Sequence, residues 1–179
     1  MYKYILIIIA GSIAALLAYA AKQPDTFRIE RSTSIQAPPE KIFAVLNDFR
    51  QSISWSPYEM RDPAMKRNFS GPATGKGSVY EFDGNKEVGT GRIEIMESVP
   101  PTRIVLQLDM IKPFEGSNTI EYTLRPVTDG TEVSWAMYGE APFISKVICI
   151  FMDMDKMVGA DFEKGLANLK SLVETGPAQ

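Results

Sequence analysis

The sequence contains no histidine and a single cysteine. Without histidine the chain has no imidazole general base, no Ser/His or Cys/His nucleophile pair and no histidine-containing metal site. The single cysteine, Cys149, cannot form an intramolecular disulfide. Its neighbours are Val147, Ile148, Ile150 and Phe151, and no base or cationic cluster near it would activate a thiol. We therefore expect Cys149 to be a buried, unreactive core residue.

Strong charge of either sign is also missing. The net charge is −3 and the isoelectric point is near 5.1. No stripe of Lys and Arg is evident, so we expect no nucleic-acid partner. Hydrophobic residues make up 45% of the 179 residues, which suits one domain with a sizeable core and one additional segment.

The additional segment is at the N-terminus, where residues 4–21, YILIIIAGSIAALLAYAA, carry no charge. As a helix this segment is about 27 Å long, close to the hydrocarbon thickness of a bilayer, so residues 1–21 are predicted to be a single-pass transmembrane anchor. The alternative is secretion after cleavage near Ala20, because Ala18-Tyr19-Ala20 has the small-x-small pattern of a signal peptide. We favour the retained anchor because the apolar core is longer than that of a usual signal peptide. We expect the domain to lie outside the cytoplasm.

The remainder divides into a linker at residues 22–26, a domain at 27–175 and a tail at 176–179. Period-two alternation of apolar residues predicts a strand at 27–35. Glycine-rich turns mark strands near 65–70 and 78–82, and Pro100 and Pro101 separate two longer strands at 90–99 and 102–111. Pro38 and Pro39 suit the first turn of a short helix. A long final helix is predicted because apolar residues recur at helical spacing: Phe162, Leu166, Leu169 and Val173.

Residues 118–140 predict a β-hairpin. Asp129-Gly130 suits a two-residue turn, which sets Leu124 opposite Trp135 and Tyr122 opposite Met137. These four side chains then share one face of the sheet. The pattern indicates a broad antiparallel sheet with an apolar, aromatic-rich concave face, which the final helix covers.

Four segments carry a family resemblance: RIERSTSIQAPPEKIFAVLNDFRQSISWSPYE, GTGRIEIMESVPPTRIVLQL, YTLRPVTDGTEVSWAM and DFEKGLANLKSLVE. Over Phe27 to Glu174 the chain resembles the polyketide cyclase/dehydrase-like branch of the START-type (SRPBCC) superfamily. The resemblance implies an α+β helix-grip fold, with a curved antiparallel sheet wrapped around a long C-terminal helix and two short helices after the first strand. It also implies a hydrophobic cavity for lipids, polyketides or other apolar small molecules. Members with one transmembrane segment are usual, which supports the anchor.

An apolar set of residues is predicted to line this ligand cavity: Trp55, Tyr80, Phe82, Leu106, Leu108, Tyr122, Leu124, Trp135, Met137, Phe151, Met157 and Phe162. Aromatic and methionine side chains give an adaptable wall for an apolar ligand. The alternative interpretation is an ordinary filled core, which has the same pattern.

Acidic residues are the available acid or base groups: Glu81, Glu94, Asp109, Glu121, Asp153 and Asp155. A carboxylate that faces an apolar cavity would have a raised pKa and could serve as a general acid or base. The hairpin, however, puts Glu121 on the face opposite Tyr122, and the spacing of Asp153 and Asp155 does not suit one site on a helix. We predict no catalytic set, no metal and no cofactor; Tyr80 and Tyr122 are the best candidates if a reaction occurs.

Three classes of function follow. The leading prediction is membrane-tethered binding of a hydrophobic small molecule or lipid, with residues 4–21 in the membrane. The alternatives are a cyclase- or dehydratase-type enzyme acting on a polyketide-like substrate and a non-catalytic interaction domain. Residues 141–154 have two interpretations: buried first turns of the covering helix, or a segment that touches the membrane beside the anchor. The sequence carries no signal for an oligomeric state.

Overall fold

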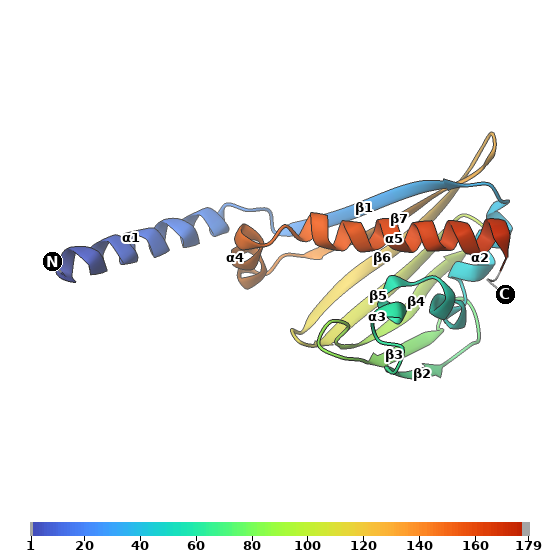
Figure 1. Cartoon of the computed structure of the whole chain (residues 1–179), viewed down its shortest axis with the longest axis horizontal. Helices are drawn as coiled ribbons and strands as arrows, with labels where there is room; N and C mark the ends of the chain where they lie inside the picture. The colour runs from blue at the N-terminus through green and yellow to red at the C-terminus, as the bar shows by residue number, and fades with distance from the viewer. Residues whose placement is uncertain (1, 177–179) are drawn as a thin grey trace.

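The computed structural model describes residues 2–176, in which an N-terminal helix, α1 (Tyr2–Ala21), precedes an α+β domain (Figure 1). The strands are β1 (Thr26–Ile35), β2 (Lys66–Ser70), β3 (Val79–Asp83), β4 (Thr90–Val99), β5 (Arg103–Lys112), β6 (Gly116–Val127) and β7 (Gly130–Glu140). The other helices are α2 (Pro39–Leu46), the 3₁₀ helix η1 (Phe49–Ser54), α3 (Pro57–Arg61), α4 (Phe143–Phe151) and α5 (Met154–Thr175). Residues 177–179 of the predicted tail lie outside the described residues.

The strands form one 7-stranded antiparallel sheet in the order β1-β7-β6-β5-β4-β3-β2. The long helix α5 lies across the sheet, and α2, η1 and α3 follow β1 (Figure 1). The helix-grip prediction is therefore confirmed, and each of the five strands predicted before the hairpin begins and ends within one residue of the observed strand.

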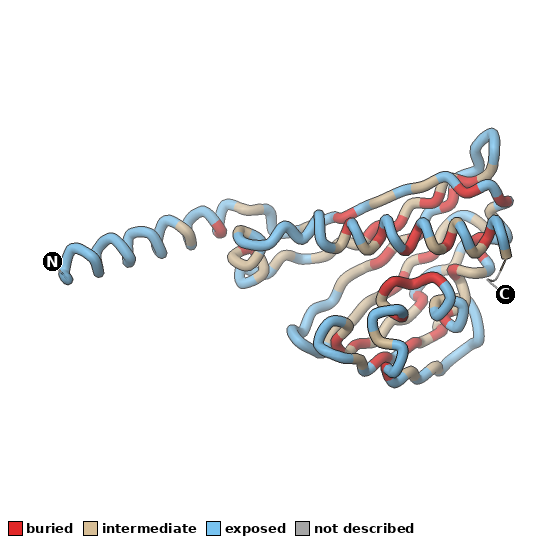
Figure 2. Tube along the Cα trace, in the orientation of Figure 1, coloured by how far each residue is buried: buried red, intermediate tan, exposed pale blue. Residues whose placement is uncertain are grey.

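The ends of α5 follow from its sequence. The Asp153 carboxylate accepts a hydrogen bond from the Lys156 backbone N–H at 3.0 Å, which caps the first turn. At the other end Gly176 has φ +83°, a conformation that glycine adopts without strain. The predicted apolar stripe of α5 is buried, and Figure 2 shows buried positions recurring along the helix.

The predicted register of the hairpin is wrong by two residues. Val127 pairs with Gly130, so Thr128 and Asp129 form the turn, and Tyr122 pairs with Trp135. Gly130 begins β7, and the backbone of Ile35 in β1 passes so close to it that a Cβ atom at this position would collide with the Ile35 carbonyl oxygen. A shift of two residues keeps every side chain on its predicted face.

Among the described helices, α1 alone is long and apolar enough to cross a membrane, with a mean hydropathy of 2.3. Its side chains are almost all exposed, and Ala20 is its one buried residue. This finding fits a membrane anchor, and it fits a signal sequence as well.

The segment at residues 141–154 differs from the expectation of burial in the core. It contains a separate helix, α4, which ends where Asp153 caps α5. Cys149 is exposed on α4, so the prediction that it is a core residue is wrong. The reason is that α4 packs at the end of the domain beside α1 instead of continuing α5 over the sheet (Figure 1).

Candidate functional site

A cavity of about 460 Å³ lies between the concave face of the sheet, helix α5 and the short helices η1 and α3. This volume is in the range of small-molecule binding sites. Its walls come from β3, β4, β5, β6 and β7, with α5 on the other side. Most of the lining is aliphatic, aromatic or methionine, which makes the cavity suitable for an apolar ligand.

The structure brings most of the predicted ligand-cavity residues together around this cavity: Trp55, Tyr80, Phe82, Leu106, Leu108, Tyr122, Trp135, Met137, Met157 and Phe162. Other apolar or aromatic residues, which were not assigned to the cavity from the sequence, also line it: Val45, Leu46, Phe49, Tyr58, Met65, Val88, Ile93, Met110, Ile120, Met154 and Val158.

Two predicted lining residues lie elsewhere. Leu124 is buried in the hydrophobic core, nearer the β6–β7 turn, where it pairs with Val133. Phe151 is 72% exposed at the end of α4, because the chain turns at Asp153 before α5 begins to cover the sheet.

Four aromatic lining residues of the cavity form one cluster. The rings of Trp135 and Phe162 stack with centroids 4.2 Å apart, and Trp55 meets Trp135 edge-on at 5.5 Å. Tyr122 lies beside both indoles. Within residues 2–176, neither indole N–H has a hydrogen-bond partner. Burial raises the pKa of Tyr122, so its hydroxyl stays protonated at neutral pH.

A buried carboxylate lies on the cavity wall at Glu59. Tyr80 donates a hydrogen bond from its hydroxyl to Glu59 Oε1 at 2.5 Å, and Arg67 Nε donates to Glu59 Oε2 at 2.7 Å. Burial, and then the hydrogen bond to Glu59, raise the pKa of Tyr80. Tyr80 is therefore a neutral donor, and the charge of Glu59 is balanced by Arg67. Apolar residues dominate the wall elsewhere, and this cluster supplies a fixed polar point within it.

Glu59 is a site residue that the sequence analysis missed. It lies in α3, which has 5 residues, and so short a helix has no periodicity to show which side faces inward. The acidic residues considered from the sequence do not line the cavity. Glu121 pairs with Arg103 at 2.6 Å across the outer face of the sheet, and Asp155 pairs with Arg31 at 2.9 Å.

The entrance of the cavity is marked by its exposed lining residues: Arg61, Lys86, Glu87, Pro113, Met154 and Met157. They belong to the end of α3, the β3–β4 and β5–β6 loops and the start of α5. Arg61 forms an ion pair with Asp161, which also lines the cavity. Burial and the Asp161 carboxylate raise the pKa of the nearby Tyr58.

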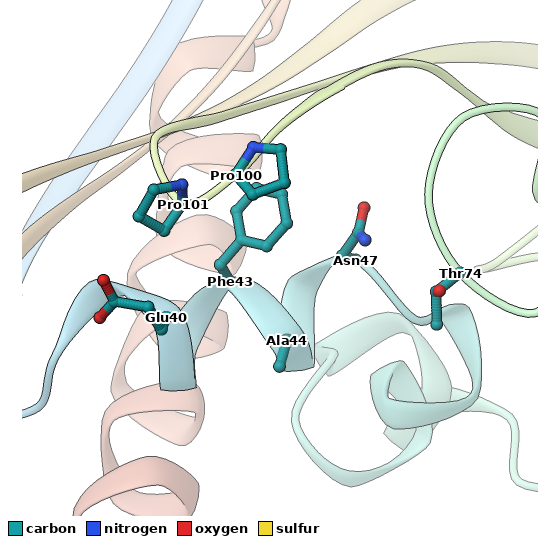
Figure 3. A pocket seen from close by; sticks show the side chains of 7 residues that line it. All are labelled: Glu40, Phe43, Ala44, Asn47, Thr74, Pro100 and Pro101. Carbon is teal, nitrogen blue, oxygen red and sulfur yellow. The ribbon is translucent and has the colours of Figure 1, made fainter.

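A second hollow of about 390 Å³ lies on the outside of the domain between α2 and the turn at Pro100 and Pro101 (Figure 3). Its other lining residues are Glu40, Phe43, Ala44, Asn47 and Thr74. Its polar side chains are Glu40, Asn47 and Thr74, which are spread along its edge, and Glu40 is the one ionisable group among the lining residues. Across residues 2–176 no three Cys, Asp or Glu side chains gather as metal ligands would.

The comparison with solved structures shows the fold. The domain is similar to a protein from Chromobacterium violaceum at 20% identity, with a TM-score of 0.59, over 87% of this chain and 100% of that one. It is similar to the Aha1 dimer from Colwellia psychrerythraea at 21% identity, with a TM-score of 0.59, over 85% and 99% of the two chains. The di-domain ARO/CYC StfQ from the steffimycin biosynthetic pathway matches at 13% identity, with a TM-score of 0.62, over 84% of this chain and 51% of that one.

The family comparison covers nearly the whole domain. No curated protein matches the chain. Residues 26–174 match the family model described as "Polyketide cyclase / dehydrase and lipid transport", a range that runs from the start of β1 almost to the end of α5. The chain therefore belongs to the polyketide cyclase/dehydrase and lipid transport family.

Proposed function

We propose that this protein is a membrane-tethered binding protein for a hydrophobic small molecule or lipid, which it holds in the cavity beneath α5. The observation that carries the proposal is the cavity of about 460 Å³, open at one entrance, with its mainly apolar wall. A filled core would leave no such space, because protein interiors pack with few voids larger than a water molecule. Membership of a family that includes lipid transport supports the same class of ligand.

The ligand has an apolar body and one polar group. The aromatic cluster of Trp55, Tyr122, Trp135 and Phe162 takes the apolar body. The polar group lies against Tyr80, whose hydroxyl donates to Glu59 and whose oxygen can still accept a hydrogen bond from a hydroxyl of the ligand. The helix α1 is retained as the anchor, and the domain lies outside the cytoplasm.

The test is native mass spectrometry of the detergent-solubilised full-length protein, followed by organic extraction and identification of the released molecule. We expect one apolar molecule per chain. The matched variant is Leu108→Trp, which fills the cavity from β5 and should remove the bound molecule. A ligand-free wild-type protein, unchanged after incubation with an extract of the native membrane, would overturn the proposal.

A cyclase- or dehydratase-type enzyme is the second candidate, and the position of Glu59 favours it. A buried carboxylate on the wall, hydrogen-bonded to the neutral hydroxyl of Tyr80, could act as a proton acceptor for a polyketide-like substrate. In the present geometry both Glu59 oxygens are occupied by Tyr80 and Arg67, so binding remains the first choice. An extracted molecule that is converted by wild-type protein but not by Glu59→Gln would select the enzyme.

A further inference from the structure

Helix α4 exposes an apolar surface. Phe143 and Ile144 are exposed in its first turn, and Phe151 at its end is 72% exposed. The sequence of the helix is FISKVICIF, in which Lys146 is the one charged residue. Lys146 is itself buried, with 7% of its surface exposed. The outward surface of α4 is therefore uncharged and apolar, which is unusual for a helix that faces water.

The contacts of Lys146 fix α4 to the linker that follows α1. Its Nζ lies 2.5 Å from Asp25 Oδ1 and donates a hydrogen bond to the Gln23 carbonyl oxygen at 3.0 Å. The Ala141 backbone N–H donates to the Asp25 carbonyl oxygen at 2.7 Å. The last turns of α1 contact α4, and Ala20 is fully buried there. Helix α4 is thus held at the C-terminal end of α1.

This attachment determines where α4 lies when α1 is in a bilayer. The chain between α1 and β1 has only residues 22–25, so α4 cannot move far from the end of the span. Tyr19 is exposed in the last turn of α1, and tyrosine is enriched at the boundary between lipid and water. An apolar helix at that depth matches the helices that lie in the plane of the interface.

The entrance of the cavity is at the same end of the domain. Met154 and Met157 line the cavity in the first turns of α5, directly after α4. Pro113, on the other side of the entrance, is followed by Phe114, which is 73% exposed. In Figure 1 the start of α5, α4 and the β5–β6 loop all lie at the end of the domain nearest α1.

We propose that α4 is an interfacial helix, that its exposed apolar surface lies in the bilayer that holds α1, and that the cavity takes its ligand directly from that bilayer. This inference rests on the proposed function and names the source of the ligand as membrane lipid. The bilayer is favoured over a protein partner because the apolar surface of α4 continues the lipid-facing surface of α1 and offers a protein no charged group to pair with.

The position of α4 is tested with the full-length protein in phosphatidylcholine vesicles. Cys149 is the only cysteine and is exposed on α4, so it can carry a bimane fluorophore without further substitution. We expect lipids brominated in their acyl chains to quench this fluorophore. The control is Cys149→Ser combined with Asp129→Cys, which places the same label on the β6–β7 turn and should remain unquenched.

An unquenched label at both positions would overturn the inference. A disulfide between two copies at Cys149, without quenching, would assign the surface to a second copy and would equally overturn it. The inference is supported if the label at Cys149 is quenched in the wild type and is no longer quenched in Ile144→Asp/Phe151→Asp. The two new carboxylates make insertion of this surface into the bilayer unfavourable.

Ligand entry is measured separately with a pyrene-labelled fatty acid, because a single acyl chain suits a cavity of about 460 Å³. We expect Ile144→Asp/Phe151→Asp to lose transfer of this probe from vesicles while it still binds the probe in detergent. Equal transfer by wild type and variant would overturn the inference. If the wild-type protein binds no probe in detergent, the proposed function fails, whereas the quenching result still decides where α4 lies.

Discussion

The hydroxyl of Tyr80 donates a hydrogen bond to the buried carboxylate of Glu59, with the two oxygens 2.5 Å apart on the wall of the cavity. Arg67 bonds the other oxygen of the same carboxylate, so β2, β3 and α3 meet at this point. A buried carboxylate needs such partners because burial without them costs free energy. The cluster therefore joins α3 to the edge of the sheet and keeps one polar point in an apolar cavity.

Replacing Tyr80 with phenylalanine should destabilise the domain. The substitution Tyr80→Phe keeps the ring, which stacks on Phe69 at 5.0 Å, and removes the hydroxyl. Glu59 then loses one of its two partners, and we expect the free energy of unfolding to fall by about 1–3 kcal/mol. Denaturant titration of the full-length protein measures the change. Tyr4→Phe removes a hydroxyl from an exposed position of α1 and should have no effect; an equal effect of the two variants would contradict the role of the cluster.

Substitutions at Leu108 and Leu124 can distinguish an open cavity from a filled core. Leu108 lines the cavity, so Leu108→Phe has space for the larger side chain, and we expect the free energy of unfolding to change by less than about 1 kcal/mol. Leu124 is in the packed core, so Leu124→Phe should lower it by about 1–3 kcal/mol. Denaturant unfolding compares the two. If Leu108→Phe and Leu124→Phe lowered the free energy of unfolding equally, the space beside Leu108 would be filled in solution and the cavity would be absent.

The same two residues show what the sequence could predict. Period-two alternation placed Leu108 and Leu124 on the concave face, and both side chains do face inward. Alternation identifies the face but carries no information on how closely α5 approaches at each position along a strand. That distance depends on the packing of the whole helix against the sheet, so the boundary between cavity and core was not predictable from one strand.

Helix α4 shows a second limit. Its sequence is apolar except for Ser145 and Lys146, and burial in the core was one of the two interpretations of it. The position of α4 depends instead on the break at Asp153 and on the contact between Lys146 and Asp25. Lys146 and Asp25 are more than a hundred residues apart in the sequence. Local patterns report the type of an element well, whereas such long-range contacts decide its position.

Gly165 allows α5 to pass close to Trp135. A Cβ atom at this position would lie 2.6 Å from Trp135 Cζ3 and 3.1 Å from Pro57 Cδ. Alanine favours a helix over glycine by about 1 kcal/mol, yet we expect Gly165→Ala to destabilise the domain by about 1–3 kcal/mol because the indole must move. The thermal midpoint and the near-ultraviolet tryptophan spectrum should both change.

The control for Gly165→Ala is Gly11→Ala, where an added Cβ meets no atom within 4 Å. This variant should leave the melting of the domain and its tryptophan spectrum unchanged. A Gly165→Ala protein as stable as the wild type would show that α5 can shift away from the sheet, which would also enlarge the cavity.

Acid should release α4 from the linker. The hydrogen bond from Lys146 and its charge hold the pKa of Asp25 below its usual value of 3.8. A carboxylate whose pKa is lowered in the folded state contributes stability above the unfolded pKa, and this contribution is lost as pH falls through the lowered value. A nitroxide on Cys149 should thus be immobile at neutral pH and become mobile only in strong acid. In Asp25→Asn the ionic partner is absent while the backbone contacts of α4 remain, so the label should be more mobile than in the wild type at neutral pH and insensitive to acid over the same range. Asp129→Asn, on the distant β6–β7 turn, should respond like the wild type; an acid response that persists in Asp25→Asn would assign the transition to another group.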